Sequence, residues 1–388
     1  MTVRLLDDWE DLPLDDLLRY CRDVVEDPDY PTVKRWREAG GKVVGHFQVY
    51  FPEEIVEAAG LLPVKVQGAT VEPRQGDAHF GAYLCSIVKT SLELGLSGRL
   101  ELDMFVSHPI CDTARNLAAV WGRNFSYPCE VLYLPQNPNS AHSVAYLRGE
   151  YDRLRRGIEE IAGRSVTDDD LRAAIAVFNE NRRLLRRLYD IKRESPWLLA
   201  VDEAYVLVAL GGRIPRSEHN RLLKAAIPMI EKRDAAPQDR MRLVFEGGFC
   251  EQPPLDLLTT IAQSSYVVDD DLLIGLRWLT DDVAADGDPL ETLARAYHEQ
   301  SSYSAVQHDL RKPKEVMLLK RIRESGAGAA VISAAKMCEP GLDELVPHMK
   351  ALDEEGIPYF VNEFEENMTS FDTLQIQLET FIENVLFA

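Results

Sequence analysis

The sequence is poor in basic side chains relative to acidic ones. Its 388 residues carry 43 Lys and Arg against 64 Asp and Glu, which gives a formal net charge of −21. Nucleic-acid binding depends on clustered cations that contact phosphates, so this balance argues against a general nucleic-acid-binding protein. The charge also has the wrong sign for an anionic membrane surface. Any phosphate-bearing ligand must therefore be held by local basic contacts. Alternatively, the acidity serves solubility alone.

Long apolar runs are missing as well. No stretch approaches the roughly 20 apolar residues that span a bilayer. The first ten residues include Asp7, Asp8 and Glu10 and contain no apolar signal core. These features predict a cytoplasmic protein that does not enter a membrane. With 46% hydrophobic and 28% charged residues, the composition is that of an ordinary globular protein long enough for two domains.

Several common binding motifs are absent. The six cysteines contain no Cys-x-x-Cys pair, so a small zinc knuckle is unsupported. A disulfide framework is not expected in a large cytosolic chain. No Gly-x-Gly-x-x-Gly follows a predicted strand, and no P-loop motif occurs. If ATP takes part in the activity, another subunit should bind it.

Predicted strands and helices alternate in two parts of the chain. The apolar runs that predict strands are residues 42–47, 61–66, 102–106 and 130–134, then 241–245, 266–268, 329–333 and 357–361. Such alternation predicts an α/β protein with two Rossmann-like or flavodoxin-like parallel sheets. We expect an amino-terminal α/β domain at residues 1–143 with a helical wrap at 4–39, a helical connecting segment at 144–237, and a carboxyl-terminal α/β domain at 238–388.

Three cysteines follow predicted strands directly. Cys111 lies between a strand and the start signals of a helix, and Cys250 and Cys338 occupy similar turns in the second half. In open parallel sheets, ligands bind outside the carboxyl ends of the strands. The amino end of a helix also favours a thiolate over a thiol. Cys85 falls within a helix-like pattern at residues 83–94.

Two facing domains would bring these thiols into one cleft. Soft thiolates in a partly dry cleft suit zinc or an iron–sulfur cluster, and three ligands would leave one metal position open for substrate or water. Alternatively, each cysteine packs as a small buried hydrophobe. Simple packing is the expectation for the remaining two, Cys21 and Cys129.

An arginine-rich helix is predicted after Thr167-x-x-Asp170, which resembles a capping box. Its cations could steer a phosphate group, but the pattern is more typical of a solvated face or of pairing with acidic neighbours. They are Arg182, Arg183, Arg186, Arg187, Lys192 and Arg193.

Several segments together resemble a known family, the 2-hydroxyacyl-CoA dehydratase and benzoyl-CoA reductase group. Residues 51–63 resemble its Pro-x-Glu-Leu…Ala-Ala-Gly-x-x-Pro motif. Three further segments resemble its cluster-cysteine motifs, and two others its carboxyl terminus. These are Leu-Cys-Ser at 84–86, Ile-Cys-Asp-Thr at 110–113 and Lys-Met-Cys-Glu-Pro at 336–340, then Gly-Ile-Pro at 356–358 and Phe-Glu-Glu-Asn at 364–367. The similarity covers nearly the whole chain.

Within this group, residues 111–121 and 134–137 look most like the smaller cluster-bearing (C-type) subunits of ATP-dependent benzoyl-CoA reductases. The resemblance implies a [4Fe–4S] cluster on Cys85, Cys111 and Cys338. It also implies a larger paralogous subunit with its own cluster, and ATP-hydrolysing subunits that deliver electrons from ferredoxin. The implied reaction is the anaerobic one-electron reduction of benzoyl-CoA to a cyclic dienoyl-CoA, a step in aromatic degradation.

The resemblance also suggests polar residues near the substrate. Glu54 matches a carboxylate that the family places there, and His46 and Gln48 lie at the same strand end, where a proton donor could stand. A helix-capping role for Glu54 is an equal alternative. His108 could bond a cluster sulfur or donate a proton, or simply lie in water. Cys250 departs from the three-cysteine pattern, which leaves a fourth thiolate open.

Three other functions compete with the reductase. A dehydratase subunit of the same family would remove water from a 2-hydroxyacyl-CoA through a ketyl radical. A two-domain binding protein would close on a small ligand without any cluster. A structural paralogue would only orient its partner subunit.

Overall fold

The computed structural model describes residues 5–47, 49–365, 368 and 370–387, and its centre is a pair of four-stranded sheets. The first sheet has the order β2-β1-β3-β4 and the second β6-β5-β7-β8, and all neighbouring strands are parallel. The strands are β1 (Val43–His46), β2 (Leu62–Lys65), β3 (Met104–Ser107), β4 (Cys129–Val131), β5 (Met241–Glu246), β6 (Ser265–Asp270), β7 (Ala329–Ala335) and β8 (Tyr359–Phe364). The predicted α/β class with two parallel sheets is confirmed.

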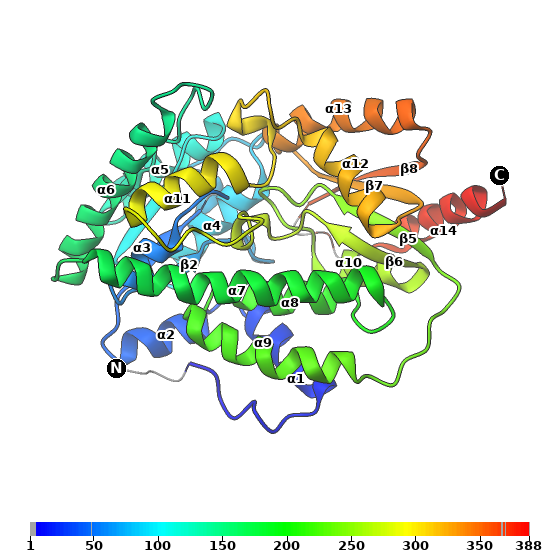
Figure 1. Ribbon diagram of the computed structural model, residues 1–388, viewed down its shortest axis with the longest axis horizontal. Coiled ribbons are helices and arrows are strands. Elements are labelled where there is room, and N and C mark those ends of the chain that lie inside the picture. Colours follow the sequence, from blue (N-terminus) through cyan, green and yellow to red (C-terminus); the bar gives the residue numbers. More distant parts are fainter. Residues whose placement is uncertain (1–4, 48, 366–367, 369, 388) are drawn as a thin grey trace.

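Helices cover both faces of the sheets (Figure 1), which explains why the central strands are mostly apolar and fully buried. The helices are α1 (Leu14–Glu26), α2 (Pro31–Glu38), α3 (Glu53–Ala58), α4 (Ser86–Leu96), α5 (Asp112–Asn124), α6 (Ser143–Ala162), α7 (Asp168–Glu194), α8 (Val201–Leu210), α9 (Arg216–Glu231), α10 (Leu255–Ser264), α11 (Pro289–Gln300), α12 (Lys314–Ser325), α13 (Glu339–Glu355) and α14 (Asp372–Phe387). Short 3-10 turns lie at Gly76–Ala78, Ile274–Leu276 and Ala305–Gln307. None of the described helices is long and apolar enough to cross a bilayer.

Several expected elements have other bounds in the structure, among them the strand after Cys129 and the helix after Cys85. The edge strand β4 starts at Cys129 and ends at Val131, because its only neighbour, β3, ends at Ser107 and offers no further partner. Cys85 caps α4 from outside the helix, whereas the sequence pattern placed it inside. The helix therefore begins at Ser86, and the Cys85 backbone has an extended conformation.

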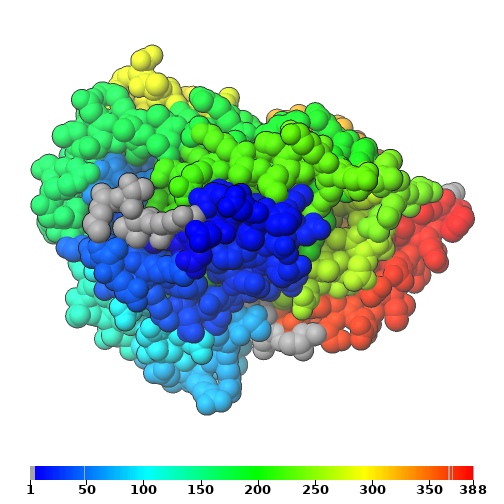
Figure 2. Space-filling view, turned by 90° about the horizontal axis from the view of Figure 1, so that it is seen from below, coloured from blue at the N-terminus to red at the C-terminus, as the bar shows by residue number. Residues whose placement is uncertain are grey.

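The amino-terminal segment packs on two different parts of the molecule. Helix α1 lies against α8 and α9, as Figure 2 shows, where the dark blue surface covers the green helices. Helix α2 instead lies beside the first sheet, since Trp36 and Arg37 bond Lys42 and Asp103. The wrap therefore joins the helical segment to the first sheet, and does not surround the first sheet alone. The domain limits at residues 143 and 237 stay a prediction.

Helix α7 runs beneath both sheets and connects them (Figure 1). Its start is the predicted capping box, in which the Thr167 hydroxyl accepts from the backbone N–H of Asp170 and Asp170 accepts from that of Thr167. It packs on α3 at one end and on β6 at the other. The main apolar core also takes in side chains from both sheets, including Phe105 and Phe245, so the two halves share one interior.

Gly247, directly after β5, allows the chain to leave β5 in close contact with β7. Its φ is +124°, and a methyl group there would lie 1.9 Å from the Ser333 carbonyl oxygen on β7. Gly247→Ala should lower the free energy of unfolding by at least about 2 kcal/mol, because strain and a backbone clash add. Chemical denaturation measures this change.

The matched control is Gly149→Ala. Gly149 is exposed on α6 and has open space around its Cα, so alanine should raise the free energy of unfolding by about 1 kcal/mol or less. Equal effects of the two substitutions would contradict the close approach at Gly247.

Candidate thiol site at the sheet switch points

Three of the four candidate cysteines follow a central strand of their sheet. In each sheet the strand order reverses between the two central strands, β1 and β3 in the first and β5 and β7 in the second. Such switch points are where parallel sheets bind ligands. Cys111 follows β3, Cys250 follows β5 and Cys338 follows β7. The turns predicted for these cysteines are therefore confirmed, although their role as ligands is a separate question.

Cys85, Cys111 and Cys338 are each the residue that caps the amino end of a helix, namely α4, α5 and α13. The Cys111 sulfur accepts the backbone N–H of Ala114 at 3.4 Å, which directly satisfies an amide at the start of α5. All three thiols thus lie where the helix dipole favours negative charge.

The thiols from the two halves lie close enough to influence one another. Burial, then Glu251 and the thiols of Cys338 and Cys111, raise the pKa of the Cys85 thiol. Burial raises the pKa of Cys111 to about 11 despite the Ala114 N–H, and Cys338 adds to this rise. Cys85 and Cys338, which are 253 residues apart in the sequence, thus lie near enough to influence each other's ionisation, and the role of the three thiols as ligands stays a prediction.

Cys250 joins this group. Its thiol lies near those of Cys338 and Cys111. The contact with Cys338, followed by burial, raises the pKa of Cys250, while the ammonium group of Lys65 acts in the opposite direction. The other two cysteines are apart from the group: Cys21 is buried in α1, and Cys129 at the start of β4 bonds the Tyr127 carbonyl.

The predicted proton donor His46 lies at the end of β1 in a fully buried network. Its Nε2 is 2.7 Å from Glu53 Oε1, and the other Glu53 oxygen accepts from Arg216. An ionised carboxylate only accepts, so Nε2 carries the proton. Burial lowers the pKa of His46, while Arg216 and His46 outweigh burial at Glu53 and lower its pKa. His46 is therefore neutral beside a charged Glu53–Arg216 pair.

The other predicted polar residues have different surroundings. Glu54 is buried and accepts from Arg182 of α7, so it serves an ion pair between two helices. His108 is buried and does not lie in water, and burial, with help from Lys65, lowers its pKa to about 3. Gln48 lies outside the described residues.

Lys65 is a site residue that the sequence interpretation missed. It ends β2, its side chain is buried, and its Nζ donates to the Phe47 carbonyl. Burial lowers its pKa to about 8, and the neighbouring Cys250 opposes that shift. A lysine at the end of the apolar run 61–66 was the available signal, because lysines are rarely buried without a partner.

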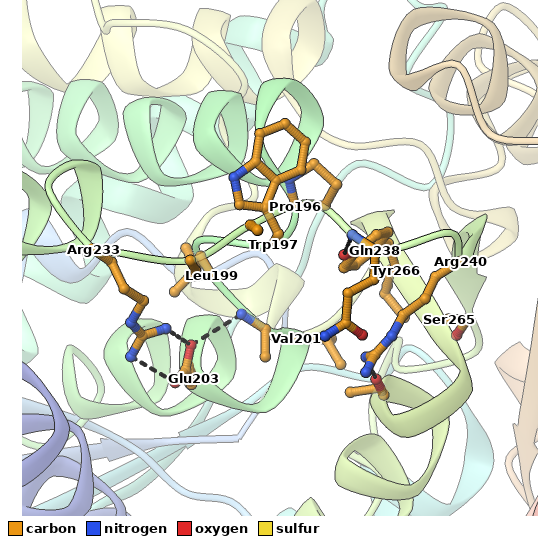
Figure 3. A pocket seen from close by; sticks show the side chains of 15 residues that line it. Pro196, Trp197, Leu199, Val201, Glu203, Arg233, Gln238, Arg240, Ser265 and Tyr266 are labelled. Atoms are coloured by element: carbon orange, nitrogen blue, oxygen red, sulfur yellow. Dashed lines mark hydrogen bonds and ion pairs between the residues drawn. The ribbon is translucent and has the colours of Figure 1, made fainter.

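Two further features of the sequence do not belong to this site. The arginines of α7 are paired with acids, as the pattern favoured: Arg183 and Arg186 share Asp282, and Arg193 pairs with Asp269. The pocket in Figure 3, of about 360 Å³, lies at the opposite ends of β5 and β6, beside Arg240 and Tyr266. It contains none of the six cysteines.

The thiol group fits a cluster better than a single ion. Among the described residues, no three His, Cys, Asp or Glu side chains converge on one point as the ligands of a single metal ion would. Cluster thiolates do not need that convergence, because each one binds a different iron. Each thiol makes ionisation of its neighbours less favourable, so a shared cationic centre would stabilise the thiolates. The amino ends of the three helices also favour negative charge.

The chain is thus an α/β protein with two parallel sheets. The cysteines at the switch points of the two sheets lie near one another and form one thiol site. Residues 48–385 match the family described as 2-hydroxyglutaryl-CoA dehydratase, D-component, and the chain belongs to this family.

Its relatives are described as enzyme subunits. The C-type subunit of benzoyl-CoA reductase from Thauera aromatica is 35% identical over 378 residues, covering 95% of this chain and 98% of the relative. The beta subunit of lactoyl-CoA dehydratase from Anaerotignum propionicum is 26% identical, with 95% and 98% covered. The beta subunit of (R)-2-hydroxyglutaryl-CoA dehydratase from Acidaminococcus fermentans is 24% identical, with 90% and 94% covered. The chain is thus similar to subunits of both reductases and dehydratases.

Glu57, beside the Glu53–Arg216 pair, gives this region a pH-dependent stability. Burial raises its pKa from 4.5 to about 7, so the folded chain retains a proton that the unfolded chain has released. The contribution of this group to the free energy of unfolding should therefore fall as pH rises from about 4.5 to about 7. Glu57→Gln should be more stable than the parent above pH 7, by on the order of 1–3 kcal/mol, and similar to it below about pH 4.

Denaturation curves across this pH range measure the difference. The control is Glu383→Gln on the exposed side of α14, which should not change the pH profile. A stability difference for Glu57→Gln that is the same at every pH would contradict the burial argument.

Proposed function

We propose that this chain is the smaller iron–sulfur subunit of an ATP-dependent benzoyl-CoA reductase. The observation that supports the proposal is the position of Cys85, Cys111 and Cys338 at three helix amino ends, near enough for Cys111 and Cys338 to affect the Cys85 thiol. The 35% identity to the C-type subunit of a benzoyl-CoA reductase supports the reductase over the dehydratases, whose beta subunits are 24–26% identical.

In this proposal Cys85, Cys111 and Cys338 hold a [4Fe–4S] cluster. When bound, such a cluster supplies one-electron transfer at a potential set by charge, hydrogen bonds and exposure. The chain itself supplies the thiolates, the positive helix ends and the Ala114 N–H that bonds the Cys111 sulfur. Cys85 and Cys338 are buried and Cys111 is half-buried, and a partly dry site strengthens these electrostatic contacts.

The buried imidazoles would hold and move protons. His46 and His108 are neutral, because burial lowers the pKa of both. The one N–H of His46 is donated to Glu53, so His46 would accept a proton at Nδ1. We propose both as proton-handling residues for the reduced acyl-CoA. For Glu54 we propose a positioning role, since the pair with Arg182 fixes α3 against α7.

Partner subunits follow from the same proposal. A paralogous larger subunit would carry a second cluster and share the acyl-CoA. Separate ATP-hydrolysing subunits would deliver electrons from ferredoxin, which agrees with the lack of a P-loop motif in this sequence.

Iron and sulfide analysis of the full chain, purified and kept without oxygen, tests the cluster. The parent should hold about four irons per chain, and Cys85→Ala, Cys111→Ala and Cys338→Ala should each lose most of them. Cys129→Ala is the matched control and should keep the parent's iron content, because Cys129 lies outside the thiol group. A parent chain without iron, or full iron content in all three variants, would refute the proposal.

Turnover assays separate the reductase from the dehydratase. The chain combined with its partner subunits, ATP and a low-potential donor should convert benzoyl-CoA to a cyclic dienoyl-CoA. Loss of water from a 2-hydroxyacyl-CoA, with no reduction of the aromatic ring, would instead assign the dehydratase reaction.

A further inference from the structure

The loop that carries Cys250 is held in place from several sides. The backbone N–H groups of Gly247 and Gly248 both donate to Asp271 Oδ1 at 3.0 Å. At the other end of the loop, the Gln252 side chain accepts the N–H of Leu273 at 2.8 Å. A loop anchored at both ends gives its central cysteine a defined position.

The same loop crosses from the second half of the molecule to the first. Glu251, the neighbour of Cys250, accepts the hydroxyl of Ser86 and the N–H of Ile87, the latter at 3.4 Å. These two residues form the first turn of α4, directly after Cys85. Glu251 therefore holds Cys250 near the helix end that bears Cys85. The close approach of Gly247 to Ser333 places the same loop beside β7, the strand that leads to Cys338.

We infer that Cys250 is a fourth thiolate ligand of the cluster, because its loop joins the Cys85 helix end to the Cys338 strand. This inference rests on the proposed function. Lys65 supports it, since a buried ammonium group near the Cys250 sulfur offsets the charge of an additional thiolate.

Four thiolates would leave no open iron on this chain. The subunit would then accept one electron from the low-potential iron–sulfur donor and pass the same electron to the partner subunit, with no bond to substrate made or broken here. The acyl group would meet an open iron position only in the larger subunit. This assigns electron transfer to one subunit and substrate reduction to the other.

Mild oxidation of the anaerobically reconstituted full chain tests the inference. The parent should keep all its iron after ferricyanide treatment and should not bind added cyanide. Cys250→Ala should lose about one iron in four on the same treatment, give the electron paramagnetic resonance signal of a three-iron cluster, and bind cyanide before oxidation. Cys129→Ala is the control and should behave as the parent does.

Each result decides the question. A parent that already loses one iron or binds cyanide overturns the fourth ligand and leaves the three-cysteine cluster intact. A Cys250→Ala chain that keeps all its iron also overturns it. Absence of iron from the parent refutes the proposed function itself. Cys250→Ala could keep its circular dichroism spectrum and yet hold no cluster. In that case a parent that keeps all its iron and binds no cyanide still supports the inference, and Cys250→Ser is the second variant to test.

Discussion

Buried ion pairs along α7 hold the two sheets in a fixed relation, and the thiol site depends on them. Arg182 pairs with Glu54 on the side of the first sheet, and Lys192 pairs with Asp270 at the end of β6 in the second. A buried ion pair is weak support for stability, but loss of one partner typically costs about 3–5 kcal/mol, since the other charge is left unpaired. The pairs therefore fix position, and sulfur atoms from two sheets can meet only if position is fixed.

The positions of the strand ends could be predicted from the sequence, because they depend on local order along the chain. An apolar run followed by a cysteine and a helix start is visible for Cys111 and Cys338, and the structure has both turns where they were expected. Cys85 was assigned to the helix interior because the apolar pattern starts before it. The helix in fact begins at Ser86, so Cys85 lies at its N-cap position while its side chain still packs in the apolar core.

The buried network could not be predicted in the same way. His46 is paired with Glu53, seven residues on, but Glu53 is paired with Arg216, 163 residues away. No local pattern links such residues, and the prediction chose Glu54, whose carboxylate lies against Arg182 instead. Adjacent residues of a helix point in different directions, so neighbouring glutamates at the start of α3 serve different partners. Sequence reasoning identified the region of the site but not the partner of each charge.

The net charge of −21 would affect the reduction potential of any cluster held at the thiol site. An electron added to a centre within an acidic protein meets repulsion, so the field of the chain lowers the reduction potential of any cluster that the thiols hold. The proposed reduction of an aromatic ring would require such a low potential. The local cations act against this field at short range: Lys65 is buried beside Cys250, and the amino ends of α4, α5 and α13 point their dipoles at the sulfurs. An acidic exterior with a few buried positive groups can therefore keep a reduced centre strongly reducing while still allowing it to form.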